Sequence, residues 1–400
     1  MAMTTTMPPS PAASQIGLNL HIVRNPVSYD SRVLKETATL RDLGRFAAVE
    51  IAGFHEHGYT EHEDLDGRAL WRVILASRRL PKNLAGQAIK FAEWRHHLVA
   101  HYRNRPLAVI HCHDLDPLPI AVRLKRLTGA HLVYDAHELE TEQSATWSLR
   151  KGLMRRTERR CMPWVDAMIT VSPSIRDWYM RTYPGLAISL VRNVPERPPD
   201  PIGPANLRDR LGVPNDALLF LYLGGLAGGR GIENMLAAFA APGIVHHLLV
   251  LGNGPLRGAV ELACARCSRL HYLPAVPPDK VLAHAAGADV GISMAEDTCL
   301  NNRYCLPNKL FESLIVGLPM LVSDLPDQRH LVESYRAGWT CTPDVTSIVA
   351  ALTAIDRGGW TAVRTSLAER TRELGWHHEA AILTELYDSL LLGQAPGDRP

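Results

Sequence analysis

Short apolar runs of strand length alternate with longer segments that carry apolar residues at helical spacing. The strand-like runs lie at residues 16–23, 47–52, 107–111, 131–134, 167–171 and 188–191 in the first half, and at 218–223, 247–251, 269–273, 288–293 and 319–323 in the second. Strands that alternate with helices are typical of a parallel sheet covered on both faces. The pattern therefore predicts an α/β protein, in which the polar residues 53–68 form a loop.

The alternation is interrupted at the proline-rich residues 195–206. Because single cores stop growing at roughly 250–300 residues, a chain of 400 residues is expected to form two domains. We predict doubly wound, Rossmann-like domains at residues 16–196 and 205–375, preceded by a disordered tail at 1–15. Residues 376–392 have an amphipathic pattern, which predicts a separate C-terminal helix.

Composition and charge narrow the class of protein. With 46% hydrophobic and 21% charged residues the chain is expected to be globular and soluble, and its net charge of +2 does not suggest nucleic-acid binding. No apolar run reaches the roughly 18 residues that a membrane span needs, and residues 1–15 lack the basic start of a signal peptide. Seven cysteines in such a chain predict reduced thiols, so we expect a cytoplasmic protein.

A polar loop at residues 301–304 leads into a segment with the features of a ligand-facing helix start. Pro307 suits the first turn of this helix, and Gly317 is expected to end it. The helix start and Lys309 suit an anion, whereas Glu312 suits a pair of hydroxyl groups. A solvated surface helix would explain the same residues equally well.

Three known motifs are approached but not completed. Residues 224–231 have almost the spacing of a phosphate-binding P-loop, but Arg230 replaces its lysine and a glycine replaces its metal-binding hydroxyl. Residues 252–258 follow a strand, yet their last glycine comes one position late for a dinucleotide-binding fingerprint. Asp114 and Asp116 have the spacing of an Asp-x-Asp metal site, although either can serve as a helix N-cap instead.

Ligands bind parallel α/β sheets at the carboxyl ends of the strands, so the polar residues there are the site candidates. In the first half these residues are His111, His113, Asp114, His137 and Glu138. In the second half they are Arg230 of the glycine loop, Asn253, Glu296, Asp297, Lys309 and Glu312. Glycines let the backbone approach a phosphate group and the cations neutralise it, so the second set suits a nucleoside diphosphate and the first a sugar. A structural role would explain any single histidine at least as well.

Several short motifs also follow one another in a recognisable order. They are Asp30 to Glu36, His111 to Asp114, Val133 to Glu138, Ala167 to Ser172, Val191 to Val194, Gly224 to Gly231, Gly252 to Leu256 and Asn301 to Glu312. In this order they resemble the retaining glycosyltransferases of family four (group 1), which have the two-domain GT-B fold. The resemblance implies two domains that face a cleft, with a nucleotide-sugar donor in the second, an acceptor in the first, and a terminal helix that crosses back to the first.

Residues and resemblance together predict a set of site residues. The predicted catalytic residues are His113, Arg230 and Lys309. The predicted donor-binding residues are Gly224, Gly225, Asn253, Gly254, Asn308, Glu312, Arg303 and Arg32. The predicted acceptor-side residues are His137, Glu138 and Asp114. In the resembling family the leaving phosphate takes the acceptor's proton, and His113 would grip the donor sugar.

Two positions depart from the usual pattern of that family. Gly225 stands where an arginine is usual, and Tyr304 stands where a glutamate is usual. Lys309 or Arg303 is therefore expected to supply the missing cation at the diphosphate, with Arg32 as a further phosphate contact. The resemblance implies a retaining transfer. Since no complete metal site stands near the glycine loop, and no obvious covalent nucleophile is visible, we expect the transfer to proceed without a metal ion or another cofactor.

Two other functions stay open at this point. A nucleotide-sugar epimerase can share the fold, and a non-catalytic nucleotide-sugar-binding protein would result if the departures destroyed catalysis. The expected partners are a nucleotide sugar and a saccharide, lipid-linked or small natural-product acceptor, but no nucleic acid. The basic helix expected at residues 146–161 could contact the inner face of an anionic membrane, although a solvated helix face would explain it equally well.

Overall fold

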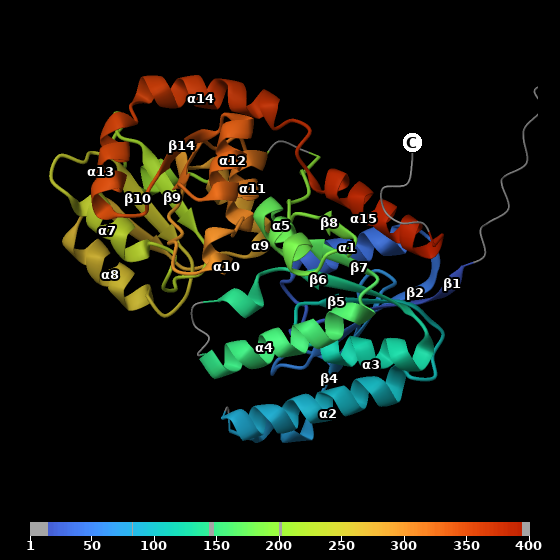
Figure 1. Cartoon of the computed structure of the whole chain (residues 1–400). Coiled ribbons are helices and arrows are strands. Elements are labelled where there is room, and N and C mark those ends of the chain that lie inside the picture. Colours follow the sequence, from blue (N-terminus) through green and yellow to red (C-terminus); the bar gives the residue numbers. More distant parts are fainter. Residues whose placement is uncertain (1–14, 82, 144–147, 200–201, 394–400) are drawn as a thin grey trace, which may run out of the picture. The chain divides into compact units, whose positions relative to one another are not determined.

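The computed structural model describes residues 15–81, 83–143, 148–199 and 202–393, and its main elements are two β-sheets with helices (Figure 1). The predicted tail at residues 1–15 lies almost entirely outside the described residues. Among the described residues, no helix is both long and apolar enough to cross a membrane.

The first sheet has eight strands in the order β3-β4-β2-β1-β5-β6-β7-β8. Its strands are β1 (Ile16–Ile22), β2 (Phe46–Phe54), β3 (His62–Asp64), β4 (Ala69–Val73), β5 (Leu107–His113), β6 (His131–Ala136), β7 (Ala167–Thr170) and β8 (Ile188–Leu190). β1 lies between β2 and β5 and is parallel to both, with His21 directly opposite His111. The edge strand β3 is antiparallel to β4, so the prediction of a loop over residues 53–68 is wrong at this point.

The second sheet has six strands in the order β11-β10-β9-β12-β13-β14. Its strands are β9 (Leu219–Leu223), β10 (His247–Leu251), β11 (Leu270–Leu273), β12 (Val290–Ser293), β13 (Met320–Ser323) and β14 (Gly338–Cys341). All neighbouring strands are parallel, and β9 and β10 are buried along their whole length. Continuous apolar runs are what parallel strands covered on both faces require.

Helices follow the strands in both sheets. They are α1 (Ser31–Asp42), α2 (Leu84–Tyr102), α3 (Leu118–Thr128), α4 (Ser148–Cys161), α5 (Pro173–Thr182), α6 (Leu207–Leu211), α7 (Ile232–Ala240), α8 (Arg257–Arg266), α9 (Pro278–Ala286), α10 (Leu300–Arg303), α11 (Asn308–Ile315), α12 (Pro326–Tyr335), α13 (Val345–Ala354), α14 (Arg357–Arg370) and α15 (Trp376–Leu391). Short 3₁₀ turns are η1 (Ala76–Arg79), η2 (Glu140–Glu142) and η3 (Met162–Trp164). The α/β class and the two parallel-sheet, Rossmann-like parts are confirmed.

Residue contacts divide the chain into two compact units. The first contains residues 1–135, 158–168 and 386–400, and the second contains residues 136–157 and 169–385. The end of α15 thus belongs to the first unit, where Tyr387 Oη lies 2.8 Å from His111 Nδ1. The second unit contains the residues on both sides of the predicted boundary at residues 195–206. A domain boundary at this place therefore stays a prediction.

Candidate functional site

The loops that follow β9 and β10 are held together backbone to backbone. Leu226 N donates to Asn253 O over 2.9 Å. A Cβ atom at Gly252 would lie 1.8 Å from Gly224 O, and one at Gly254 would lie 2.4 Å from Leu226 O. Only glycine fits such an approach, so these glycines create two interlocked loops at the carboxyl edge of the sheet. The sequence predicted this proximity from the strand ends.

Lys309 brings its ammonium group to the first of these loops. Its Nζ lies 3.9 Å from the centre of the Tyr222 ring, and a Cβ atom at Gly224 would lie 3.7 Å from Nζ. Tyr222 Oη donates to Gly225 O over 2.9 Å, which fixes the ring against the loop. Partial burial of Lys309 and the charge of Arg230 lower the pKa of the lysine to about 7.

Arg230 is the second cation near these loops, and it lies half-buried just before α7. Neither its guanidinium group nor the Lys309 ammonium group forms a hydrogen bond or ion pair with a residue that the structure describes. Burial is the main cause of the lowered pKa of Lys309, and the charge of Arg230 lowers this pKa further, whereas the charge of Glu312 raises it. Two like charges that form no ion pair among the described residues, beside exposed glycine backbone, suit a bound polyanion.

The start of α11 lies next to Lys309, because Asn308 is the first residue of this helix. Pro307 occupies the N-cap instead of the first turn, and no side chain caps the helix. The first N–H groups of α11 and its positive dipole end therefore suit an anion. Glu312 follows Asn308 by about one turn and is half-buried.

Arg303 and Tyr304, two positions that the sequence analysis singled out, each contact another residue of the protein. Arg303 is exposed in α10, with its Nε 3.8 Å from Asp297 Oδ2. The backbone oxygen of Tyr304 accepts a hydrogen bond from Ser172 Oγ over 2.8 Å. The contact of Arg303 with a diphosphate stays a prediction, as does the role of Tyr304 at the position of the usual glutamate.

Asn301 is a site residue that the sequence did not single out. Its Oδ1 accepts from Leu139 N over 2.8 Å, and its Nδ2 donates to Glu138 Oε2 over 3.1 Å. It therefore ties the loop after β6, which contains the predicted acceptor-side residues His137 and Glu138, to α10. The sequence signal for this role was the polar stretch at residues 301–304. The partners Glu138 and Leu139 could not be predicted, because they are far from Asn301 in the sequence.

In the first unit, three histidines stack in the interior of the sheet. The ring centres of His21 and His111 are 4.5 Å apart, as are those of His111 and His113. His113 Nδ1 lies 3.3 Å from Asp135 Oδ2, and His113 Nε2 lies 2.9 Å from His21 Nδ1. An Nδ1–H that donates to Asp135 leaves Nε2 to accept from His21. Both ring nitrogens of the predicted catalytic His113 thus have protein partners, and burial lowers the pKa of His21.

Arg32 holds the carboxylates of the same cluster. Its Nε and one terminal nitrogen donate to Asp135 over 2.8 and 2.7 Å, and the same terminal nitrogen lies 3.1 Å from Glu36 Oε1. Burial lowers the pKa of Arg32, but the two carboxylates outweigh burial and raise it. The guanidinium group is buried, so its predicted phosphate contact stays a prediction that would require these ion pairs to rearrange. Asp114, which follows β5, has a positive φ of 67°.

The histidine cluster is also a candidate metal site by distance. Ligand atoms of His21, Glu36, His111 and His113 lie within 4.8 Å of one another. The ring planes of the histidines differ by only 18–28°, so their nitrogen lone pairs run side by side and do not converge on one point. In addition, Glu36 forms an ion pair with Arg32, which would compete with a metal ion for this carboxylate. The cluster therefore fits a hydrogen-bonded core better than a metal centre.

The chain is similar to one family of known sequences. Residues 43–193 match the model of Glycosyltransferase Family 4, a stretch that runs from just before β2 to just after β8. None of the curated protein sequences compared with the chain is significantly similar to it.

Solved structures resemble the chain over nearly its whole length. Sucrose-phosphate synthase of Thermosynechococcus elongatus has a TM-score of 0.77 and 17% identity, covering 94% of this chain and 100% of that chain. HepE of Anabaena, solved in complex with UDP-glucose, has a TM-score of 0.68 and 14% identity, with 93% and 100% covered. The α,α-trehalose 6-phosphate synthase of Burkholderia multivorans has a TM-score of 0.65 and 14% identity, with 95% and 99% covered. At such identities the likeness concerns the fold.

Proposed function

We propose that the chain transfers a sugar from a nucleotide-diphosphate sugar to an acceptor, because residues 43–193 match the model of Glycosyltransferase Family 4 and the chain has the GT-B fold. The proposal is supported most by one observation, the pair of cations Lys309 and Arg230 beside the exposed Gly224 backbone. A diphosphate would supply ion-pair partners for both cations, which form no ion pair among the described residues.

The geometry supports a division of roles within the second unit. The diphosphate would lie against the glycine loop and the start of α11, with Lys309 and Arg230 on its oxygens. Glu312 would accept hydrogen bonds from the ribose hydroxyl groups, which a charged acceptor binds more strongly than a neutral one. The sugar–phosphate bond breaks with growing negative charge on the leaving diphosphate, so fixed cations stabilise the transition state more than the ground state.

We further propose that the transfer retains the configuration of the sugar and requires no metal ion. Two fixed cations and a helix start can together neutralise the departing diphosphate, which is the task that a metal ion performs in other transferases. The leaving phosphate would then take the proton of the acceptor hydroxyl on the same face of the sugar. The grip of His113 on the donor sugar stays a prediction, since both of its ring nitrogens have partners among the buried residues of the first unit.

The first test compares variants at the proposed diphosphate site. Lys309→Ala should lower turnover by roughly 10²–10³-fold, the scale for losing one preorganised oxyanion-hole donor. Lys309→Arg keeps the charge and should be milder, although the two side chains differ in shape. Glu312→Ala should weaken nucleoside-diphosphate binding by about 1.5–3 kcal/mol, measured by calorimetry. Unchanged affinity in the Glu312 variant would contradict the ribose assignment.

A donor screen by product mass identifies the reaction, and UDP-glucose is a sensible first donor because HepE was solved with it. A product with the sugar joined to an acceptor supports the proposal, whereas a free epimerised nucleotide sugar would point to the epimerase alternative. The anomeric configuration of the product, read by NMR, tests retention. Activity that EDTA abolishes and Mn²⁺ restores would reject the metal-free mechanism.

A further inference from the structure

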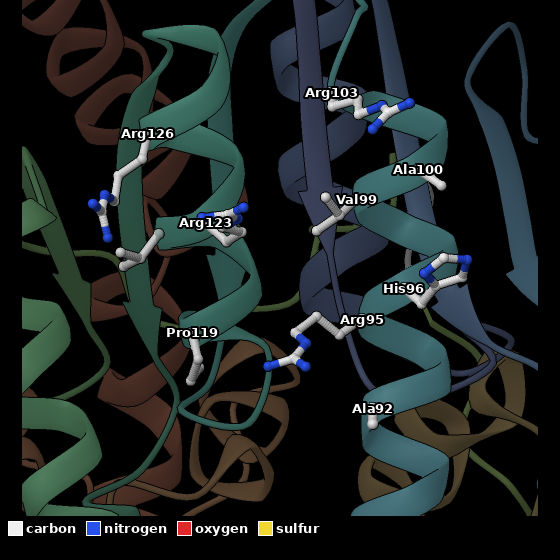
Figure 2. Close-up of a pocket in the computed structure, with 10 residues that line it drawn as sticks. Ala92, Arg95, His96, Val99, Ala100, Arg103, Pro119, Arg123 and Arg126 are labelled. Atoms are coloured by element: carbon white, nitrogen blue, oxygen red, sulfur yellow. The ribbon is translucent and has the colours of Figure 1, made fainter.

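A basic groove runs between α2 and α3 in the first unit, and it shares no residue with the proposed diphosphate site of the second unit. Its cavity has a volume of about 550 Å³. The lining residues are Ala92, Arg95, His96, Val99, Ala100, Arg103, Pro119, Val122, Arg123 and Arg126. Figure 2 shows the side chain of Arg95 extending from α2 into the space between the two helices.

The four arginines of the groove have no anionic partner. Arg95, Arg103, Arg123 and Arg126 are exposed, and none forms an ion pair with a residue that the structure describes. The sequence of α3 contains no acidic residue, and the single acidic residue of α2, Glu93, accepts hydrogen bonds from the backbone of η1. The net charge of the whole chain is only +2, so this concentration of positive charge is a local feature.

Apolar side chains continue the groove along both helices. Val99 and Val122 lie half-buried in its floor. Ile89 lies three positions before Ala92 on the same face of α2, and its side chain is 52% exposed. On α3, Leu127 follows Arg123 by one turn and is 44% exposed. The surface therefore combines guanidinium groups with apolar side chains that water does not favour.

We propose that this groove binds the phosphate group of an anionic lipid and holds α2 and α3 against a membrane surface. Guanidinium groups match phosphate oxygens in a two-pronged geometry, and the apolar floor and Ile89 suit the less polar region below the headgroups. A fully polar polyanion would leave these apolar side chains without a partner. This proposal does not depend on the chemistry of sugar transfer.

The experiment measures co-flotation of the full chain with vesicles of pure phosphatidylcholine or of phosphatidylcholine containing phosphatidylglycerol. The protein should float only with the anionic vesicles, and less at high salt. Each arginine near such a surface contributes a factor of about 5 in partitioning, so Arg95→Gln/Arg123→Gln should weaken binding roughly 30-fold. The double variant Arg95→Lys/Arg123→Lys should bind more strongly than the glutamine variant and less strongly than the wild type, because lysine keeps the charge but lacks the paired donors of a guanidinium group.

The matched control removes two exposed arginines elsewhere. Arg210→Gln in α6 and Arg266→Gln in α8 change the net charge equally and should leave flotation unchanged. Equal losses in the groove and control variants would overturn the proposal, as would loss only in the α4 variant Arg156→Gln/Arg159→Gln. If the wild type bound glycerol phosphate but did not float with anionic vesicles, the groove would be a site for a soluble phosphate ligand. This result would also overturn the membrane proposal. Thermal unfolding of each variant checks that the fold is unchanged.

Discussion

At the scale of single residues, the environment of Lys309 decides its chemistry. The side chain is half-buried and lies near a second cation, Arg230, and both effects disfavour its protonated form in the free protein, whereas the face of the Tyr222 ring favours that form. A bound diphosphate would reverse this balance, because an opposite charge within a few ångströms favours the charged form. Ligand and proton should therefore bind to this site cooperatively.

The lowered pKa of Lys309 predicts a pH dependence of diphosphate binding. Below pH 7 the free protein already carries the proton, and above pH 7 the proton must be taken up on binding. The affinity should fall as the pH rises through about 7, by at most tenfold per pH unit.

Calorimetry between pH 6 and 9 checks this dependence on the wild type and on Lys309→Arg, whose charge persists throughout. The ratio of the two affinities removes the titration of the nucleotide itself. A ratio that stays constant over this range would show that Lys309 does not titrate there.

At the scale of elements, the two glycine-containing loops act as one structure. The carbonyl of Gly224 fills the space where a side chain at Gly252 would stand, so the backbones of the two loops are in direct contact. The candidate diphosphate site is thus built on a fixed backbone, which lowers the cost of ordering it when a ligand binds.

Gly252→Ala should destabilise the protein by about 1–3 kcal/mol, the usual cost of forcing extra atoms into a packed site. Gly258→Ala in α8 is the control, because a Cβ atom there meets nothing within 4 Å and should stabilise the helix by up to about 1 kcal/mol. Urea unfolding measures both changes. Similar stabilities of the two variants would contradict the interlocked loops.

Elements were predictable from the sequence where local pattern decides them. The apolar runs identified the central strands. Ser172 has a residue type that favours an N-cap, and it caps α5, since its Oγ accepts from Ile175 N over 3.3 Å. The edge strand β3 was missed because His62–Asp64 is polar and exposed, and only pairing with β4 makes it a strand. The ring of Tyr222 under Lys309 was missed because no local rule connects residues so distant in sequence.

The fate of His113 shows a further limit. Its place at a strand end was visible in the sequence, but the direction of its ring nitrogens depends on His21 and Asp135, which come from other strands. Arg32 likewise stood at a helix start, as a phosphate ligand would, yet two carboxylates engage it. The sequence pattern correctly placed His113 at a strand end and Arg32 at a helix start. It could not show whether each side chain binds buried residues of the protein or a ligand.

At the scale of the whole molecule, α15 links the two units, because it begins in the second and ends in the first. Within the first unit, Tyr387 is buried, its ring packs edge-on to Phe46, and burial raises its pKa well above the usual value. Its hydroxyl group lies 2.8 Å from His111 Nδ1, so the terminal helix takes part in the same interior network as the histidine stack.

Tyr387→Phe should therefore lower the free energy of unfolding by about 0.5–1.5 kcal/mol, the net value of a typical hydrogen bond. Tyr29→Phe provides the control, since Tyr29 is 76% exposed and should tolerate the change. Urea unfolding followed by tryptophan fluorescence gives both values. Equal stability of the two variants would mean that the Tyr387 hydroxyl contributes nothing to the network.

The first unit is made of segments that are far apart in the sequence, which has a consequence for folding during synthesis. This unit contains the first residues of the chain, yet it is completed only by residues from Leu386 onward. The second unit has all of its residues, through Glu385, before Tyr387 is translated. Domains of many proteins fold from the N-terminus during synthesis, but here the unit that contains residues 1–135 is completed only after the last residue of the second unit has been translated. Until then, Phe46 lacks the edge-on contact with the Tyr387 ring, and His111 lacks the Tyr387 hydroxyl group as its partner.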